Sequence, residues 1–274
     1  MTYPTIMVHL GMGPTHAGLL RVAADLAARF HAGVIGIAAC QPMEVMADAY
    51  GLGDVIQQDM DDIRQSIETL EAEFHAALDS RVERLEWRSA VTTTSLADFI
   101  AHEARSADLV VTGLGPGPAP EGNRRVDLAS LIMQAGRPVL IVPKEAHDAR
   151  MERVMVGWND TREVRRAISD AMPILQQAKH VTVAAIVPAA DMASGRTQVS
   201  GVTGWLKQHG IVAHALVAPS NGTDAVLLEQ LAEDDGADLI VAGAYGHSRV
   251  REWALGGVTR DLLLHGRRCA LLSH

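Results

Sequence analysis

Two heptapeptides decide the fold of this chain, Ala107-Asp108-Leu109-Val110-Val111-Thr112-Gly113 and Ala237-Asp238-Leu239-Ile240-Val241-Ala242-Gly243. Each begins with Ala-Asp, continues as an apolar run of the length of a buried strand, and ends at glycine. They stand 130 positions apart, and the pairs Gly136-Arg137 and Gly266-Arg267 repeat this spacing. A repeat of this length indicates a duplicated domain rather than a solenoid.

Apolar runs of strand length alternate with helical patterns through both halves of the chain. We expect strands at 5–10, 33–40, 82–89, 108–112 and 138–142, and again at 153–158, 180–187, 211–217, 239–242 and 269–272. We expect helices at 15–30, 54–78, 95–105, 128–134, 161–177, 200–209, 223–233 and 257–265. Thr15 and Ser95 are expected as helix caps, and Pro173 is expected to kink or divide its helix. The alternation predicts an α/β fold with parallel sheets and right-handed crossovers.

The polar segment 144–150 is the predicted linker, which gives domains at 1–146 and 151–274. The chain has 274 residues, 48% of them hydrophobic and 21% charged, which is typical of a globular protein. Its longest apolar runs have strand length, so we expect no membrane span. No signal peptide is expected after Met1, and Cys40 and Cys269 are expected to be reduced, so the predicted location is cytoplasmic. A net charge of −9 argues against a nucleic-acid partner.

A glycine-rich segment follows the second heptapeptide and has the composition of a phosphate-binding loop. Gly243 and Gly246 are followed, after a spacer of nine residues, by Gly256 and Gly257. Glycines lack the Cβ atoms that keep a phosphate away from the backbone, and the N-terminus of the next helix supplies donors and partial positive charge. The alternative without a ligand is that these glycines only shape a tight turn.

In a parallel α/β sheet, ligands lie beyond the carboxyl ends of the strands, at the point where the strand order reverses. The loops after the first and fourth strands of the second half are therefore expected to face one ligand. The first of these loops is Asn159-Asp160-Thr161. Asn159 or Asp160 could reach a ribose or an adenine edge, although Asn159 and Thr161 could instead only cap a helix.

This pattern resembles the nucleotide motif of the universal stress protein family, G-x2-G-x9-G-(S/T), and the resemblance extends over both halves as in the tandem type. It implies two flavodoxin-like domains, each a five-stranded parallel sheet of order 3-2-1-4-5 with helices on both faces. It also implies ATP binding, with or without Mg²⁺, in the C-terminal domain, and pairing through the last strand, so that the halves form a pseudo-dimer and the chain a homodimer. The residues that it implies for the nucleotide are Asn159, Asp160, Thr161, Val187, Gly243, Gly246, His247, Ser248, Arg249, Gly256, Gly257, Val258 and Thr259.

Two positions depart from the family pattern. Gly257 stands where the motif has Ser or Thr, and Asn159 stands where an acidic residue is usual. The first half departs further, because Pro116 takes the place of Gly246 and Asp127 that of Gly257. Proline has no N–H to offer, and an aspartate would repel a phosphate, so the first half is expected to be a structural partner.

Other chemistry is scarce in the sequence, which contains no Walker-type loop and no G-x-S-x-G or H-E-x-x-H motif. No catalytic residues and no metal site are predicted, and at most slow ATP hydrolysis is expected. The expected function is adenine-nucleotide binding in stress response or regulation. Two alternatives remain open, namely a nucleotide-free protein-interaction scaffold and an enzyme of a related nucleotide-hydrolysing group.

Overall fold

The structure is a computed structural model that describes residues 2–13, 16–43, 53–114, 124–146, 148–244 and 266–274. Its first half contains the strands and helices β1 (Thr5–His9), α1 (Ala17–Phe30), β2 (Gly33–Cys40), α2 (Gly53–Leu78), β3 (Leu85–Val91), α3 (Leu96–Glu103), β4 (Leu109–Gly113), α4 (Leu128–Gln134) and β5 (Val139–Val142). The second half contains β6 (Arg153–Trp158), α5 (Arg162–Leu175), β7 (His180–Val187), α6 (Met192–Gln208), β8 (Ala213–Pro219), α7 (Asp224–Asp234), β9 (Leu239–Gly243) and β10 (Cys269–Ser273).

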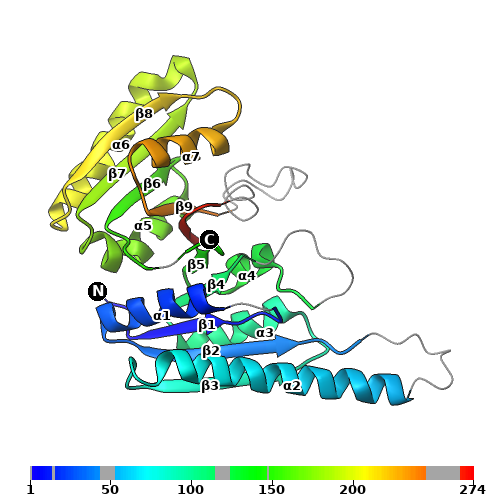
Figure 1. Cartoon of the computed structure of the whole chain (residues 1–274). Coiled ribbons are helices and arrows are strands. Elements are labelled where there is room, and N and C mark those ends of the chain that lie inside the picture. The colour runs from blue at the N-terminus through cyan, green and yellow to red at the C-terminus, as the bar shows by residue number, and fades with distance from the viewer. Residues whose placement is uncertain (1, 14–15, 44–52, 115–123, 147, 245–265) are drawn as a thin grey trace.

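All ten strands form one sheet, in the order β3-β2-β1-β4-β5-β10-β9-β6-β7-β8. Each half therefore has the predicted order 3-2-1-4-5, and within each half neighbouring strands pair in parallel. The halves meet where β5 and β10 pair in antiparallel orientation, with Leu140 opposite Leu271 (Figure 1). The predicted α/β fold is confirmed, and the two expected sheets are fused into a single one. The domain boundaries at 146 and 151 stay a prediction.

Buried apolar side chains cover both faces of the sheet, as strands flanked by helices on both sides require. On one face the core includes side chains of α1, α2, α5 and α6, and on the other those of α3, α4 and α7. Strand β2 is buried at every position, and Cys40 at its end and Cys269 in β10 are both free and buried. The absence of a disulfide between them agrees with the expectation of reduced thiols.

The aspartates of the two repeated heptapeptides make equivalent hydrogen bonds in the two halves. Asp108 Oδ2 accepts a hydrogen bond from the backbone N–H of Thr5 at 2.9 Å. Asp238 accepts hydrogen bonds from the N–H groups of Glu152, at 3.0 Å, and Arg153, at 3.1 Å. Each aspartate thus fastens the start of the fourth strand of its half to the start of the first. The sequence repeat reflects this shared fastening.

Several helix boundaries differ from the predictions. Helix α6 begins at Met192 rather than near Ser200, because its first turns are rich in Ser, Thr and Gly and carry little helical pattern. Helix α5 contains Pro173 and ends two residues beyond it, at Leu175, so the proline does not divide the helix. Ser95 precedes α3 without a side-chain capping bond. Thr15 and the helix expected at 257–265 lie outside the described residues.

Candidate nucleotide site at the carboxyl ends of β6 and β9

The carboxyl ends of β6 and β9 lie side by side at one edge of the sheet. The strands are parallel neighbours, with Gly157 opposite Ala242. The strand order of the second half reverses between them, because β7 follows β6 on one side and β10 follows β9 on the other. The loops after these strands therefore flank the crevice in which ligands bind in open α/β sheets.

Gly243, the last residue of β9, lies directly against the first turn of α5. A β-carbon at this position would lie 2.4 Å from the backbone nitrogen of Val164 and 2.7 Å from the carbonyl carbon of Glu163. A β-carbon does not approach non-bonded atoms this closely, so only glycine allows the helix to lie against the strand end. This packing alone explains why Gly243 is a glycine, whether or not a phosphate binds nearby.

The residues between β6 and α5 bond mostly to one another. Thr161 caps α5, with its Oγ1 accepting from Val164 N–H at 3.4 Å and donating to Asn159 Oδ1 at 3.0 Å. Asp160 has a positive φ of 52°, in the left-handed region that few residues other than glycine adopt. Arg165 Nη2 donates to the Asp160 carboxylate at 2.6 Å and to the Asp160 carbonyl at 3.2 Å. Thr161 therefore caps the helix, as the alternative interpretation of this loop predicted.

Glu163 is a buried carboxylate that the sequence interpretation did not single out. Its side chain is 2% exposed; Oε1 accepts from Arg162 Nε, and Oε2 has no partner in the described part of the chain. Burial raises the pKa of Glu163, but hydrogen bonds from Arg162, the helix backbone and Thr161 outweigh it, so the pKa lies below its usual value. An acidic residue in the first turn of a helix is the sequence signal that could have pointed to it.

The remaining predicted site residues are only partly visible. Val187 ends β7 at the same edge, and its carbonyl accepts from Ser220 N–H at 2.8 Å. Its side chain packs against Gly195 of α6, so it faces a helix. Gly246, His247, Ser248, Arg249, Gly256, Gly257, Val258 and Thr259 lie outside the described residues. The nucleotide-site residues thus stay a prediction, of which Asn159, Asp160, Thr161 and Gly243 lie together at one edge.

The corresponding edge of the first half is filled by side chains. His9, at the end of β1, shares a 2.9 Å hydrogen bond between its Nδ1 and Thr112 Oγ1 of β4. Burial, assisted by the charge of His16, lowers the pKa of His9 to about 4, so this imidazole is neutral near pH 7. At the equivalent positions in the second half stand Gly157 and Ala242, which have almost no side chain.

Asp127 occupies the start of α4 in the first half. Its Oδ1 accepts from Ala129 N–H at 3.1 Å, and its Oδ2 accepts from Ser130 Oγ at 2.6 Å. The carboxylate thus takes the place at the helix N-terminus that a phosphate would otherwise need. This contact supports the prediction that the first half has a structural role.

Among the described residues, no group of three or more His, Cys, Asp and Glu side chains could hold a metal ion. Within the same ranges, no helix combines the length and the apolar composition that crossing a bilayer demands.

Comparison with known proteins supports the fold assignment. A universal stress protein from Archaeoglobus fulgidus DSM 4304 superposes with a TM-score of 0.77 at 12% identity, over 98% of this chain and 95% of that one. A protein of unknown function from Pseudomonas aeruginosa PAO1 gives a TM-score of 0.61 at 15% identity, over 99% and 92% of the two chains. A candidate universal stress protein from Pseudomonas aeruginosa UCBPP-PA14 gives 0.60 at 17% identity, over 99% and 93%. No protein-family model and no curated protein matches the sequence.

These superpositions cover both halves, so the chain has a tandem α/β fold that runs through the full length of its structural relatives. That fold is the fold of a tandem universal stress protein, and the resemblance predicted from the glycine motif is confirmed at the level of fold.

Proposed function

We propose that this protein is a tandem universal stress protein that binds an adenine nucleotide, ATP first of all, through its C-terminal half. The observation that carries the proposal is the position of the G-x2-G-x9-G segment. Its first glycine, Gly243, ends β9 beside the loop that follows β6, at the reversal of strand order. Binding of ATP, with or without Mg²⁺, would serve stress sensing or regulation in the cytoplasm.

The proposal assigns tasks to the glycine segment and to several of the predicted side chains. Backbone N–H groups of the glycine segment hold the phosphates, and Ser248 and Thr259 donate hydroxyl hydrogen bonds. Arg249 offsets phosphate charge, and Asn159 meets the ribose or the adenine edge. None of these groups is a general base placed to activate water, so the proposed role is binding and slow turnover at most.

A nucleotide-free scaffold is the second candidate, and two observations favour it. Gly243 is explained by its contact with Val164, and the Asp160 carboxylate is already paired with Arg165 at 2.6 Å. Both features exist without a ligand. The scaffold would act through its surface, as an interaction module of the same fold, and would need no nucleotide.

Calorimetric titration of ATP into protein stripped of bound nucleotide separates these candidates. We expect binding in the micromolar to millimolar range, and we expect nucleotide to be released when freshly purified protein is denatured. The absence of heat at millimolar ATP, together with the absence of released nucleotide, would rule out the nucleotide proposal and favour the scaffold.

Two matched variants locate the site. Gly246→Val places a branched side chain where the phosphates are proposed to lie, and it should abolish ATP binding. Pro116→Val changes the corresponding residue of the first half and should leave binding unchanged. If Gly246→Val still binds ATP, or if Pro116→Val loses it, the assignment to the C-terminal loop is wrong. Light scattering of the same samples tests the proposed homodimer.

A further inference from the structure

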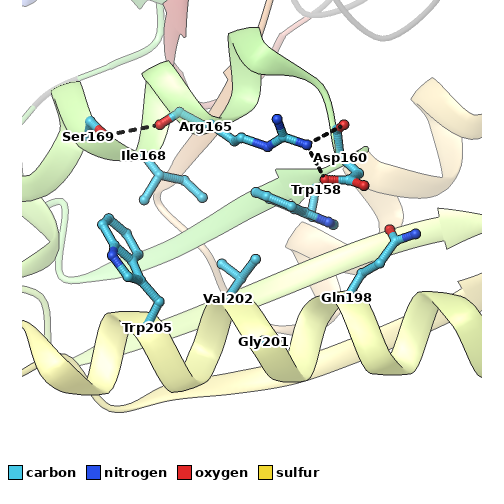
Figure 2. A pocket seen from close by; sticks show the side chains of 9 residues that line it. All are labelled: Trp158, Asp160, Arg165, Ile168, Ser169, Gln198, Gly201, Val202 and Trp205. Atoms are coloured by element: carbon cyan, nitrogen blue, oxygen red, sulfur yellow. Dashed lines mark hydrogen bonds and ion pairs between the residues drawn. The ribbon is translucent and has the colours of Figure 1, made fainter.

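A pocket of about 420 Å³ lies between α5 and α6, on the face of the second half that these two helices cover (Figure 2). Its size falls within the usual range for small-molecule sites, which is roughly 300–1,000 Å³. Of the predicted nucleotide residues that the structure describes, only Asp160 lines this pocket, and Val187 and Gly243 do not. The pocket is lined by Trp158, Asp160, Arg165, Ile168, Ser169, Gln198, Gly201, Val202 and Trp205.

In the first half, the helices that correspond to α5 and α6 are α1 and α2. Helices α1 and α2 pack against each other there, and Arg81, just beyond α2, forms an ion pair with Asp25 of α1 at 2.7 Å. In the second half, α6 presents Gly201 to the gap, and a β-carbon on Gly201 would have no atom within 4 Å. Direct contacts thus hold α1 and α2 together, while α5 and α6 leave open space beside Gly201.

The indole of Trp158 carries an unused hydrogen-bond donor at this pocket. Trp158 is 7% exposed, and its Nε1 has no partner in the described part of the structure. A buried donor without an acceptor is costly, and Trp N–H groups usually find one. Figure 2 shows the indole between the two helices, with Gln198 reaching up beside it.

Gln198 covers the approach to this donor and is only weakly held. Its Nε2 makes one long hydrogen bond, 3.4 Å, to Ser194 Oγ on the preceding turn. Rotation of the Gln198 side chain therefore costs little and gives a ligand access to the Trp158 N–H. The pocket thus offers a single specific donor behind a movable side chain.

The rest of the wall selects for a flat, uncharged molecule. Trp205, which is 37% exposed, faces the pocket from α6, and Ile168 and Val202 supply apolar surface. Aromatic faces favour planar partners by stacking. The two charged groups at the rim, Arg165 and Asp160, form an ion pair with each other, so together they add no net charge to the pocket.

We propose that this pocket binds a neutral, planar aromatic molecule of one or two rings, which accepts a hydrogen bond from Trp158 Nε1 through a ring nitrogen or a carbonyl oxygen. The ligand lies between the faces of Trp158 and Trp205, and its acceptor edge replaces Gln198 at the indole donor. Asp160 at the rim is also a predicted nucleotide residue, and it is the one described residue that the two sites share.

Isoquinoline and naphthalene are a matched pair of probes, because they have the same shape and only isoquinoline has an acceptor. In a mildly alkaline buffer isoquinoline is neutral. The chain has four tryptophans, so a ¹H–¹⁵N spectrum contains four indole signals, and the signal lost in Trp158→Phe identifies Trp158. We expect isoquinoline to move this signal strongly downfield and to bind about five-fold to ten-fold more tightly than naphthalene.

Two leucine variants on α6 test the location. Gly201→Leu fills the pocket and should abolish the isoquinoline shift. Gly204→Leu is the control, since Gly204 is on the same helix, also has open space at its β-carbon and does not line the pocket. It should keep wild-type binding. If Gly201→Leu does not fold, Trp158→Phe replaces it, and the preference for isoquinoline over naphthalene should vanish.

Three results would each overturn the proposal: no movement of the Trp158 signal at millimolar isoquinoline, an equal effect of naphthalene, or binding that survives in folded Gly201→Leu. ATP titration of Gly201→Leu distinguishes a failure of this proposal from a failure of the nucleotide proposal. We expect nucleotide binding, where present, to be unchanged by this variant.

Discussion

The hydroxyl of Tyr3 donates a 2.5 Å hydrogen bond to the backbone carbonyl of Asp170, and this bond joins the N-terminal segment of the first half to α5 of the second. Tyr3 is 3% exposed and packs edge-on against Phe30 at a ring distance of 5.0 Å. Burial, reinforced by the negative charge of Asp170, raises the pKa of Tyr3, so the phenol remains a donor at ordinary pH.

Tyr3→Phe should therefore destabilise the fold by about 1 kcal/mol, because the ring packing remains and the Asp170 carbonyl loses its donor. Urea denaturation followed by circular dichroism measures this change. Ser273→Ala is a control within the second half, since it removes only the bond from Ser273 Oγ to the Asp170 carboxylate at 2.9 Å. Separate unfolding of the two halves in Tyr3→Phe, and not in Ser273→Ala, would show that the Tyr3 bond couples them. Unchanged stability would contradict a structural role for this bond.

Gly243→Ala should destabilise the protein by about 1–3 kcal/mol, because the added carbon overlaps the backbone of Val164 and Glu163 and forces α5 to move. Gly113→Ala is the matched control at the equivalent position of the first half. A β-carbon there would have its nearest neighbours 3.9 Å away, so we expect a change close to zero. Melting temperatures of the two variants give the comparison, and equal shifts would mean that Gly243 does not carry the packing described.

The stability of the protein should depend on pH through His9. Its pKa is about 4 in the folded protein, against about 6.5 in the unfolded chain, because burial disfavours the charged form. The unfolded chain therefore binds a proton that the folded protein does not. The contribution of neutral His9 to the free energy of unfolding is complete above pH 6.5. It decreases by at most about 3 kcal/mol as the pH falls toward 4.

His9→Gln tests this directly, because glutamine keeps a polar group near Thr112 and does not titrate. Free energies of unfolding from urea titrations across this pH range should decline less steeply for the variant than for the wild type. A variant with the wild-type slope would show that His9 is not the titrating group.

The repeated segments account for most of what the sequence could predict. The Ala-Asp starts and glycine ends of β4 and β9 marked equivalent strands, and the α/β alternation predicted parallel sheets. The strand order within each half was implied by the family resemblance. The structure explains the aspartates, because Asp108 and Asp238 bind N–H groups at the starts of β1 and β6. Such local patterns are visible in sequence because the same backbone groups need the same partners twice.

Other features depend on distant residues and left little signal in the sequence. The approach of Val164 to Gly243 is set by how α5 packs on the sheet, and a glycine after a strand reads equally well as a turn. The pocket beside Trp158 depends on the separation of α5 and α6, and α6 itself was predicted too short. Within the described ranges, the Trp158 indole N–H lacks a partner because of the residues packed around it, which the sequence does not reveal.

The antiparallel pairing of β5 with β10 has a consequence for how this protein assembles. In a dimer of single-domain chains, these two strands would have to meet by collision. Here they belong to one chain, so their association is intramolecular and does not weaken on dilution. Among the described strands, β3 and β8 are the outer ones, and these two have an edge free for sheet extension by another chain. Because one gene encodes both halves at separate positions, either half can change alone. The His9–Thr112 pair of one half and the Gly157–Ala242 pair of the other illustrate an asymmetry that a dimer of identical subunits cannot have.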